Sequence, residues 1–380
     1  MGSTFTGLSG KTKEDFGHGD AQFITYMNVF SNPVANLEMT EAVEIDAKQN
    51  RVKKGDVFFT TSSETPEEVG MSCVMPENKD NIYLNSFCFG YRPTEKFDLD
   101  YLAYVLRADS FRKEMKFLAQ GISRYNISKN KVMEVSIPIP NLEEQTMVGR
   151  YFSTLDHLIT LHQRKCEQTK KLKKYMLQKM FPQNGAKVPE IRFDGFTYDW
   201  EQRKLIDYLE VSSEKNRDNR FTKEDVLSVS GEYGIVNQIE FQGRSFAGAS
   251  VSNYGVVENG DVVYTKSPLK SNPYGIIKTN KGIPGIVSTL YAVYKPKEIT
   301  DSKFVQIYFE LDSRMNSYMH PLVNKGAKND MKVSAENALK GMVSFPKKDE
   351  QEMISLYFST LDNLITLHQR QHKLHLNMLL

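Results

Sequence analysis

The sequence predicts an α+β fold in which two mixed α/β globular parts are separated by two long antiparallel helices, related as a pseudo-twofold internal repeat. Residues 151–164 (YFSTLDHLITLHQR) recur as residues 357–370 (YFSTLDNLITLHQR), so 13 of 14 positions agree at an offset of 206. Both copies have the apolar spacing of a helix, and strand-like segments precede each copy. Together these three observations indicate a duplicated structural unit.

The repeat continues upstream in weaker form. Residues 52–60 (VKKGDVFFT) resemble residues 257–265 (VENGDVVYT), and a glycine opens a polar loop in each copy, at Gly121 and Gly326. The near-identical helices indicate equivalent partners for the two copies, whereas the divergent globular parts indicate different ones. Relaxed drift after a duplication is the alternative. The predicted domains are two globular parts, 1–141 and 183–347, and two helices, 142–182 and 348–380.

The first long helix is predicted from its apolar spacing. Between Leu142 and Phe181 there is no proline and one glycine, apolar residues recur every three or four positions, and Pro182 ends the helix. About 40 residues rising 1.5 Å each span about 60 Å, which requires a partner helix. Residues 349–380 are expected to pair antiparallel with it. The lysine-rich run 170–174 is expected to face solvent, with a contact to the DNA backbone or to a partner as the alternative. The expected helix-pair or partner contacts are Tyr151, Phe152, Leu155, Leu158, Ile159, Tyr357, Phe358, Leu361, Leu364 and Ile365.

The globular parts combine strands with a smaller number of helices. Alternating or continuous apolar runs between turn residues predict strands. They lie at residues 22–29, 56–61, 82–91 and 133–138 in the first part, and 226–229, 256–264, 285–294 and 342–345 in the second. Helices are expected at 99–118 and 302–319, and a short linker at 183–185.

Composition narrows the class of protein. The chain has 380 residues, of which 40% are apolar, so it can bury sizeable cores. No run of 18 apolar residues occurs and no secretory signal is visible, so neither a transmembrane helix nor export is expected. The three cysteines, Cys73, Cys88 and Cys166, are too few and too scattered for a disulfide framework, which favours the cytoplasm. The net charge of +2 provides no globally basic field for nucleic acid.

Three candidate catalytic or metal motifs fail on spacing. Residues 7–12 (GLSGKT) have two residues between the glycines where a phosphate loop needs four. Residues 272–274 (NPY) lack the second proline of an amino-methyltransferase motif. His368, His372 and His375 share a helix face, but no glutamate follows the first histidine, so a solvated face is expected there rather than a metal site. The chain is therefore expected not to be an enzyme.

Polar and basic loops remain at matching places in the two copies. Arginine and asparagine make bidentate contacts to base edges, and lysine, serine and threonine bind phosphates. Any one such loop could be a mere solvated turn, but their paired occurrence favours DNA binding. The candidates in the first part are Lys11, Lys13, Thr61, Ser62, Arg124, Tyr125, Asn126, Lys129 and Lys131. Those in the second are Lys266, Lys270, Ser271, Asn272, Lys325, Lys328, Asn329 and Lys332.

The order of the duplicated motifs resembles the specificity subunit of type I restriction–modification systems. The motifs are a Gly-Asp-Val strand (55–57, 260–262), a proline run (137–140, 344–346) before Glu-Gln (144–145, 350–351), a Leu-Asp-x-Leu-Ile helix (155–159, 361–365) and the segment 188–196. The resemblance covers essentially the whole chain. One departure is that the first unit lacks a counterpart of residues 188–209.

The resemblance implies two target recognition domains, each reading one half of a bipartite, asymmetric DNA site. The helices would space these domains and dock two modification methyltransferase subunits, and restriction subunits would join that core. It implies no cofactor on this chain, because S-adenosylmethionine, ATP and Mg²⁺ belong to the partner subunits. Two alternatives stay open: a free-standing two-headed DNA-binding regulator, and a helical scaffold that does not bind DNA.

Overall fold

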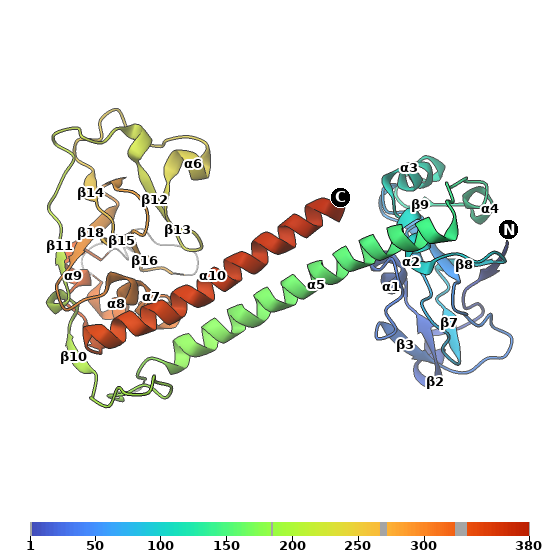
Figure 1. Cartoon of the computed structure of the whole chain (residues 1–380), viewed down its shortest axis with the longest axis horizontal. Coiled ribbons are helices and arrows are strands. Elements are labelled where there is room, and N and C mark those ends of the chain that lie inside the picture. The colour runs from blue at the N-terminus through green and yellow to red at the C-terminus, as the bar shows by residue number, and fades with distance from the viewer. Residues whose placement is uncertain (1, 184, 267–271, 324–332, 380) are drawn as a thin grey trace. The chain divides into compact units, whose positions relative to one another are not determined.

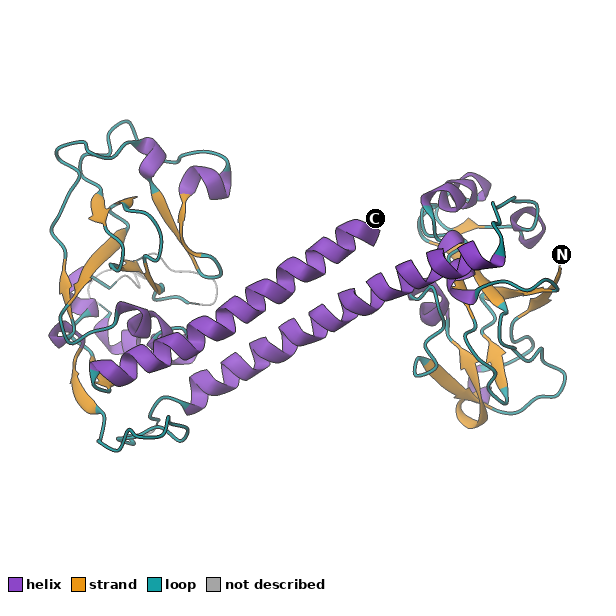
Figure 2. Ribbon diagram, viewed as in Figure 1, coloured by secondary structure: helices purple, strands orange, loops and turns teal. Residues whose placement is uncertain are grey.

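The structure, a computed structural model, describes residues 2–183, 185–266, 272–323 and 333–379. It divides into two compact units, of which the first is Met1–Leu161 with His372–Leu380 and the second is His162–Gln371. Two long helices, α5 (Leu142–Lys179) and α10 (Lys348–Leu379), contribute to both units (Figure 1). Helices and strands occur together in each globular part (Figure 2), as the α+β prediction requires.

An antiparallel four-stranded sheet forms the centre of the first unit. Its strands follow the order β1 (Gly2–Thr6), β8 (Cys88–Pro93), β4 (Val57–Thr60) and β6 (Ser72–Val74). The remaining strands are β3 (Thr40–Val43), β2 (Phe16–Ile24) and β7 (Ile82–Leu84) in a second sheet, and the pair β5 (Ser62–Ser63) and β9 (Tyr125–Asn126). The helices are α1 (Tyr26–Ser31), α2 (Leu99–Val105), α3 (Asp109–Leu118), α4 (Lys129–Val132) and the 3-10 turn η1 (Lys13–Asp15).

The second unit repeats this central sheet. Its order is β11 (Leu209–Val211), β18 (Tyr291–Pro296), β15 (Val262–Thr265) and β16 (Ile277–Thr279). The paired strands are β10 (Glu201–Lys204) with β19 (Met342–Phe345), β12 (Leu227–Ser230) with β13 (Gly234–Asn237), and β14 (Gly255–Val257) with β17 (Gly285–Val287). The helices are α6 (Gln238–Gln242), α7 (Ser302–Tyr308), α8 (Asp312–Met319), α9 (Ala335–Ala338) and the 3-10 turns η2 (Leu205–Asp207), η3 (Lys223–Asp225) and η4 (His320–Leu322).

The aspartate of the duplicated Gly-Asp-Val motif stabilises the turn before the central strand in each unit. Asp56 is buried, accepts a hydrogen bond of 2.7 Å from the backbone N–H of Lys53, and forms an ion pair with Arg92 on β8. Asp261 is also buried; it accepts from the backbone N–H of Glu258 and forms an ion pair with Lys295 on β18, both at 2.8 Å. A buried carboxylate needs such partners to offset its lost hydration. The aspartate therefore closes the turn before the central strand in both units.

Each helix predicted after the central sheet is broken in two. Residues 99–118 form α2 and α3, and residues 302–319 form α7 and α8. Arg107 stands at the first break and donates from its guanidinium to the carbonyl of Ser72 at 2.8 Å and to three carbonyls of the α1 region. Glu310 stands at the equivalent break and binds Lys173. Neither break contains a proline or a glycine. The long-range hydrogen bonds of Arg107 and Glu310 stabilise the two breaks instead.

Local side-chain capping shortens other predicted elements. The strand predicted at 22–29 ends at Ile24, because the Thr25 hydroxyl caps α1 by accepting from the Asn28 N–H at 3.1 Å. The strand predicted at 82–91 becomes β7 and β8, because Asn85 accepts from the Phe87 N–H in a turn between them. Residues 133–138 form no strand.

The long helices run antiparallel within the second unit. His162 Nδ1 of α5 lies 3.2 Å from His368 Nδ1 of α10, and Lys173 of α5 donates to Asp362 of α10 at 2.6 Å. The residue number therefore falls along α10 as it rises along α5. The two histidines occupy equivalent positions of the repeat, as a twofold relation between the helices requires. Lys173 is buried, so the lysine run 170–174 is not wholly the solvated face that its composition predicts.

The aromatic residues of the duplicated segment require a correction. They are expected as helix-pair or partner contacts, but Phe152 and Phe358 pack mainly within the unit that each helix joins. Phe152 packs on Tyr104 of α2 with ring centroids 5.5 Å apart, and Phe358 lies in the second core with Phe181 at 6.2 Å. The repeated sequence thus anchors a domain at one end and meets its copy at the other, near His162 and His368. The remaining members differ in exposure: Leu155 and Leu361 are buried, Leu158, Ile159, Tyr357 and Ile365 are half-buried, and Tyr151 and Leu364 are exposed.

The Glu-Gln motif fixes the start of each long helix. Gln145 accepts from the Asp98 N–H at 3.1 Å and donates to the Pro140 carbonyl at 2.9 Å. Gln351 accepts from the Asp301 N–H and donates to the Pro346 carbonyl, both at 2.9 Å. The same glutamine contact therefore ties each long helix to the helix that follows the central sheet of its unit.

Candidate nucleic-acid interface

Two loops predicted separately as DNA contacts lie together in the first unit. Strands β5 and β9 pair antiparallel, with Ser62 opposite Asn126 and Ser63 opposite Tyr125. The Ile127 N–H extends the pairing by donating to the Thr61 carbonyl at 3.0 Å. The structure therefore brings four predicted residues, Thr61, Ser62, Tyr125 and Asn126, into one small sheet.

A tight turn positions Arg124 beside this sheet. Gly121 has φ of +147°, and a Cβ atom there would lie 2.1 Å from the carbonyl oxygen of Arg124, so the turn requires glycine. The backbone of Gln120 exchanges two hydrogen bonds with that of Asn126, at 2.9 and 2.8 Å, which closes the loop. The exposed guanidinium of Arg124 donates to the Ser62 hydroxyl from Nη2 at 3.1 Å and from Nε at 3.3 Å.

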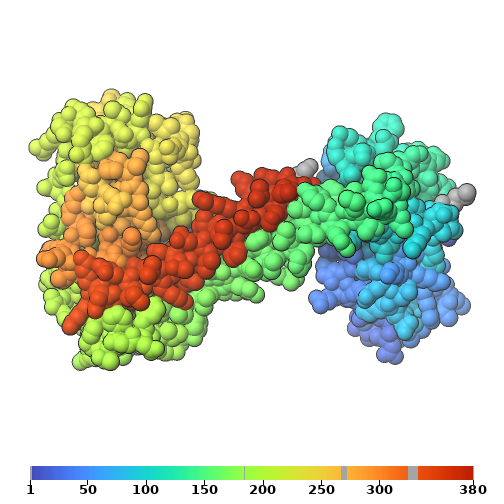
Figure 3. Space-filling view, in the orientation of Figure 1, coloured from blue at the N-terminus to red at the C-terminus, as the bar shows by residue number. Residues whose placement is uncertain are grey.

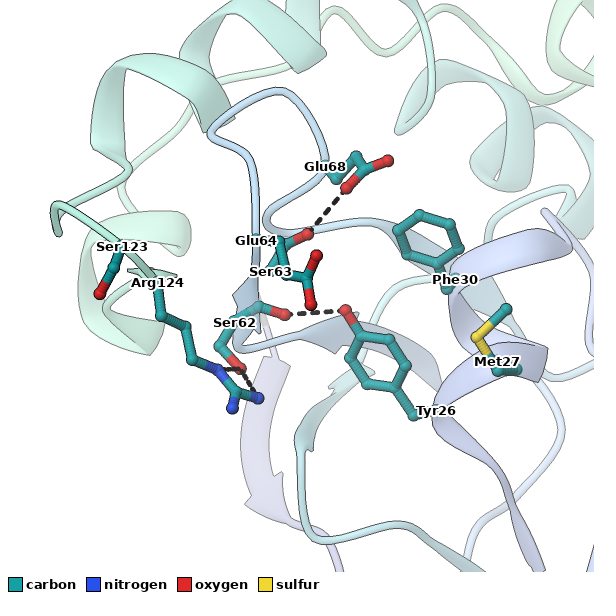
Figure 4. A pocket seen from close by; sticks show the side chains of 9 residues that line it. All are labelled: Tyr26, Met27, Phe30, Ser62, Ser63, Glu64, Glu68, Ser123 and Arg124. Atoms are coloured by element: carbon teal, nitrogen blue, oxygen red, sulfur yellow. Dashed lines mark hydrogen bonds between the residues drawn. The ribbon is translucent and has the colours of Figure 1, made fainter.

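An open pocket of about 630 Å³ lies beside Arg124 (Figure 4). Its lining residues come from α1, from the β5 loop and from the 121–124 turn: Tyr26, Met27, Phe30, Ser62, Ser63, Glu64, Glu68, Ser123 and Arg124. The rings of Tyr26 and Phe30 stack 6.0 Å apart, and the Tyr26 hydroxyl donates to the Ser62 carbonyl at 2.8 Å. Burial raises the pKa of Tyr26, so its phenol stays a neutral donor at neutral pH.

Four predicted lysines of the first unit have different environments. Lys131 is exposed and Lys129 half-buried on α4, which follows β9 directly. Lys11 pairs with Asp46 at 3.1 Å, and this hydrogen-bonded contact raises the pKa of the ammonium. Lys13 is exposed in η1. Lys129 and Lys131 lie on the helix that follows β9, close to it in the sequence. Lys11 and Lys13 do not line the pocket.

Most of the predicted contacts of the second unit lie outside the described residues: Lys270, Ser271, Lys325, Lys328, Asn329 and Lys332. Lys266 is half-buried after β15, and burial lowers the pKa of its ammonium. Asn272 is buried and donates to Asp312 at 2.9 Å at the start of α8. The expectation that Asn272 reads a base is therefore corrected: its amide faces into the domain.

Sequence reasoning missed half of the pocket. Tyr26, Phe30 and Glu68 carry no motif, and α1 begins in a segment predicted as strand. The sequence offers one signal for Glu68, which is that it follows the polar loop 60–63 after a few residues. Within the described parts of the chain, no group of three or more histidine, cysteine, aspartate or glutamate side chains is arranged to hold a metal ion. No helix in those parts is long and apolar enough to cross a membrane.

Comparison with known proteins shows what the chain is similar to. A family model described as "Type I restriction modification DNA specificity domain" matches residues 5–171. Residues 5–171 of this chain are therefore similar to that domain. The match spans the first globular part and most of α5, and the duplicated sheet order carries the same architecture through the second unit. The resemblance predicted from the duplicated motifs is confirmed, and the specificity subunit is the DNA-recognition subunit of such systems rather than the catalytic one.

Individual specificity subunits show similarity along the chain. The MjaX type I specificity-subunit sequence of Methanocaldococcus jannaschii is 24% identical over 381 residues, covering 92% of this chain and 82% of that protein. The MjaVIII specificity subunit of the same organism is 32% identical over 84 residues, 22% of this chain and 20% of that protein. The crystal structure of the type I S subunit from M. genitalium has a TM-score of 0.57 at 14% identity and covers 100% of this chain and 91% of that one. The last comparison shows a shared fold.

Proposed function

We propose that each unit of this specificity subunit reads one half of a bipartite, asymmetric DNA site. The observation that carries this proposal is that the central sheet is the same in both units, down to the Asp56 and Asp261 ion pairs, whereas the loops around it differ. The first unit gathers an arginine, an asparagine and several hydroxyl groups at one place on its surface. These are the groups that bind base edges and phosphates.

We propose further that the long helices dock two modification methyltransferase subunits. Apolar side chains stand exposed on α10 at Leu367 and Leu374, which are seven residues apart, and Leu356 is 64% exposed on the same helix. Much of α10 lies at the surface in the space-filling view (Figure 3). On α5, Met147 is 69% exposed. Exposed apolar stripes of this kind mark protein interaction surfaces, and duplicated helices suit two copies of one partner.

The partners would supply the chemistry. In this proposal S-adenosylmethionine is bound by the methyltransferase subunits, and ATP and Mg²⁺ are used by the methyltransferase and restriction subunits of the assembly. The three free cysteines, all buried, suit the reducing cytoplasm in which such an assembly would work.

Exchanging residues 1–140 for the corresponding region of another specificity subunit should change one half-site and leave the other unchanged. The reason is that the first unit has its own core and its own binding loops. The measurement is mapping of methylated positions in DNA from cells that express the chimaera with its methyltransferase. A simultaneous change of both half-sites would contradict the two-reader proposal.

Arg124→Ala should lower specific affinity by about 1–3 kcal/mol and relax one base position, because a guanidinium can donate bidentately to guanine. Lys131→Ala should weaken binding to all sequences alike and reduce the salt dependence, because an exposed lysine contacts phosphate. Titration of the assembled complex against matched and mismatched duplexes at several salt concentrations separates the two. Sequence-independent losses for both variants would assign Arg124 to the phosphate backbone.

A further inference from the structure

We infer that Glu68 is a second base-reading residue of the first unit, and that it accepts a hydrogen bond from the exocyclic amino group of a cytosine. This inference rests on the proposed function and concerns the pocket beside Arg124. Arginine at that position accounts for a guanine, and the carboxylate would account for a cytosine. Glu68 is exposed and lines the same pocket as Arg124 (Figure 4).

Two consecutive serines of β5 hold the two charged side chains. The Ser62 hydroxyl accepts from Arg124, whereas the Ser63 hydroxyl donates to Glu68 Oε2 at 3.1 Å. Both serines are buried, at 6% and 8% exposure, and their strand is fixed by its pairing with β9. One rigid element therefore presents an arginine and a carboxylate to a single pocket. The second oxygen of the carboxylate, Oε1, can accept from a ligand while Oε2 stays on Ser63.

The two charges bind serines rather than each other. Arg124 and Glu68 are both described residues, and no ion pair joins them. Opposite charges in one pocket normally pair when nothing else holds them, so the serines keep each group available to a ligand. Guanine offers two acceptors and cytosine one amino donor to the major groove, which is the complement of an arginine beside a glutamate.

The chemistry favours a base over a phosphate as the partner of Glu68. DNA phosphates repel a carboxylate, so an acidic residue on a DNA-binding surface costs affinity unless it meets a donor. The exocyclic amino groups of cytosine and adenine are the major-groove donors, and a carboxylate, which only accepts, pairs with cytosine N4. Glu68 would thus add discrimination at a base pair rather than affinity for DNA in general.

Glu68→Gln tests the inference, with Glu67→Gln as the matched control. Glu67 is the adjacent exposed carboxylate, and it pairs with Lys116 outside the pocket. The assembled complex is exposed to duplexes randomised across the half-site, and base preference at each position is read by sequencing the bound fraction. We expect Glu68→Gln to reduce the preference for cytosine at one position about 10-fold and to raise acceptance of adenine there, because glutamine pairs bidentately with adenine. Glu67→Gln should leave every base preference unchanged.

Ser63→Ala provides a second variant that keeps the charge of Glu68 but removes its tether. It should weaken discrimination at the same position, which also covers the case in which Glu68→Gln fails to fold. Equal effects of both glutamate variants on all sequences would overturn the inference, since Glu68 would then act only through its charge. If the exchange of residues 1–140 alters one half-site while Glu68→Gln alters none, the proposed function stands and this inference fails. If the exchange alters no half-site, the proposed function itself fails.

Discussion

Replacing Glu350 with alanine should lower the free energy of unfolding of the second unit by about 3 kcal/mol, because it breaks an ion pair whose carboxylate is fully buried and whose guanidinium is half-buried. Glu350 has no exposed surface and accepts two hydrogen bonds of 2.8 Å from the Arg192 guanidinium. Its Oε1 also lies 3.3 Å from the indole N–H of Trp200. The alanine variant would leave a half-buried arginine and a buried indole without their acceptor. Urea unfolding followed by fluorescence of Trp200, the single tryptophan, reports this unit directly.

The repeat itself provides the control for this experiment. Glu144 occupies the equivalent position of the first copy, in the same Glu-Gln motif, yet its side chain is exposed. Glu144→Ala should therefore change stability by less than about 0.5 kcal/mol. Glu350→Gln, which keeps the shape but loses the charge, should fall between the two. Similar small effects at Glu144 and Glu350 would show that the Arg192 contact contributes little.

This asymmetry shows where prediction from the sequence stops. The periodicity predicts both long helices because it is a local property of the chain, and the length and duplication of the first helix predict that the two helices pair. The duplication also predicts that Glu144 and Glu350 are equivalent, which holds for the backbone. The side chains differ because the segment that carries Arg192 and Trp200 has no counterpart in the first unit. The role of a residue here depends on what packs against it, and a motif does not report that.

Prediction of the candidate interface from the sequence is limited in the same way. Ser62 and Arg124 were both predicted as DNA contacts, but only the pairing of β5 with β9, across more than 60 residues of sequence, puts them in contact. Glu68 and Tyr26 were missed because their roles come from that long-range packing. Asn272 shows the converse, since a polar residue in a polar loop was expected at the surface and instead binds Asp312 within the domain.

Lys173→Met should be the second strongly destabilising change, with a loss of about 3 kcal/mol. The buried ammonium donates to Glu310 at 2.5 Å and to Asp362 at 2.6 Å, so it joins α5 to the α7–α8 break and to α10. Removing one partner of a buried ion pair costs about 3–5 kcal/mol, and the partial exposure of the two carboxylates places this site at the lower end. Methionine keeps most of the side-chain volume, so the loss measures charge rather than packing. Urea unfolding followed by Trp200 fluorescence gives the value.

Three comparisons make this test specific. Lys174→Met removes a charge from the exposed neighbouring residue and should have little effect. Adding Glu310→Gln and Asp362→Asn to Lys173→Met should recover most of the loss, because no unpaired carboxylates then remain. Burial alone lowers the pKa of Lys173, but Glu310 and Asp362 outweigh burial and the net pKa is raised. The stabilisation should therefore be complete at neutral pH and disappear only as the pH rises through that raised pKa. If Lys173→Met itself causes little loss, Lys173 acts by filling space and its charge does not join α5 to α10 and to the α7–α8 break. If the triple variant recovers nothing, the loss does not come from unpaired carboxylates.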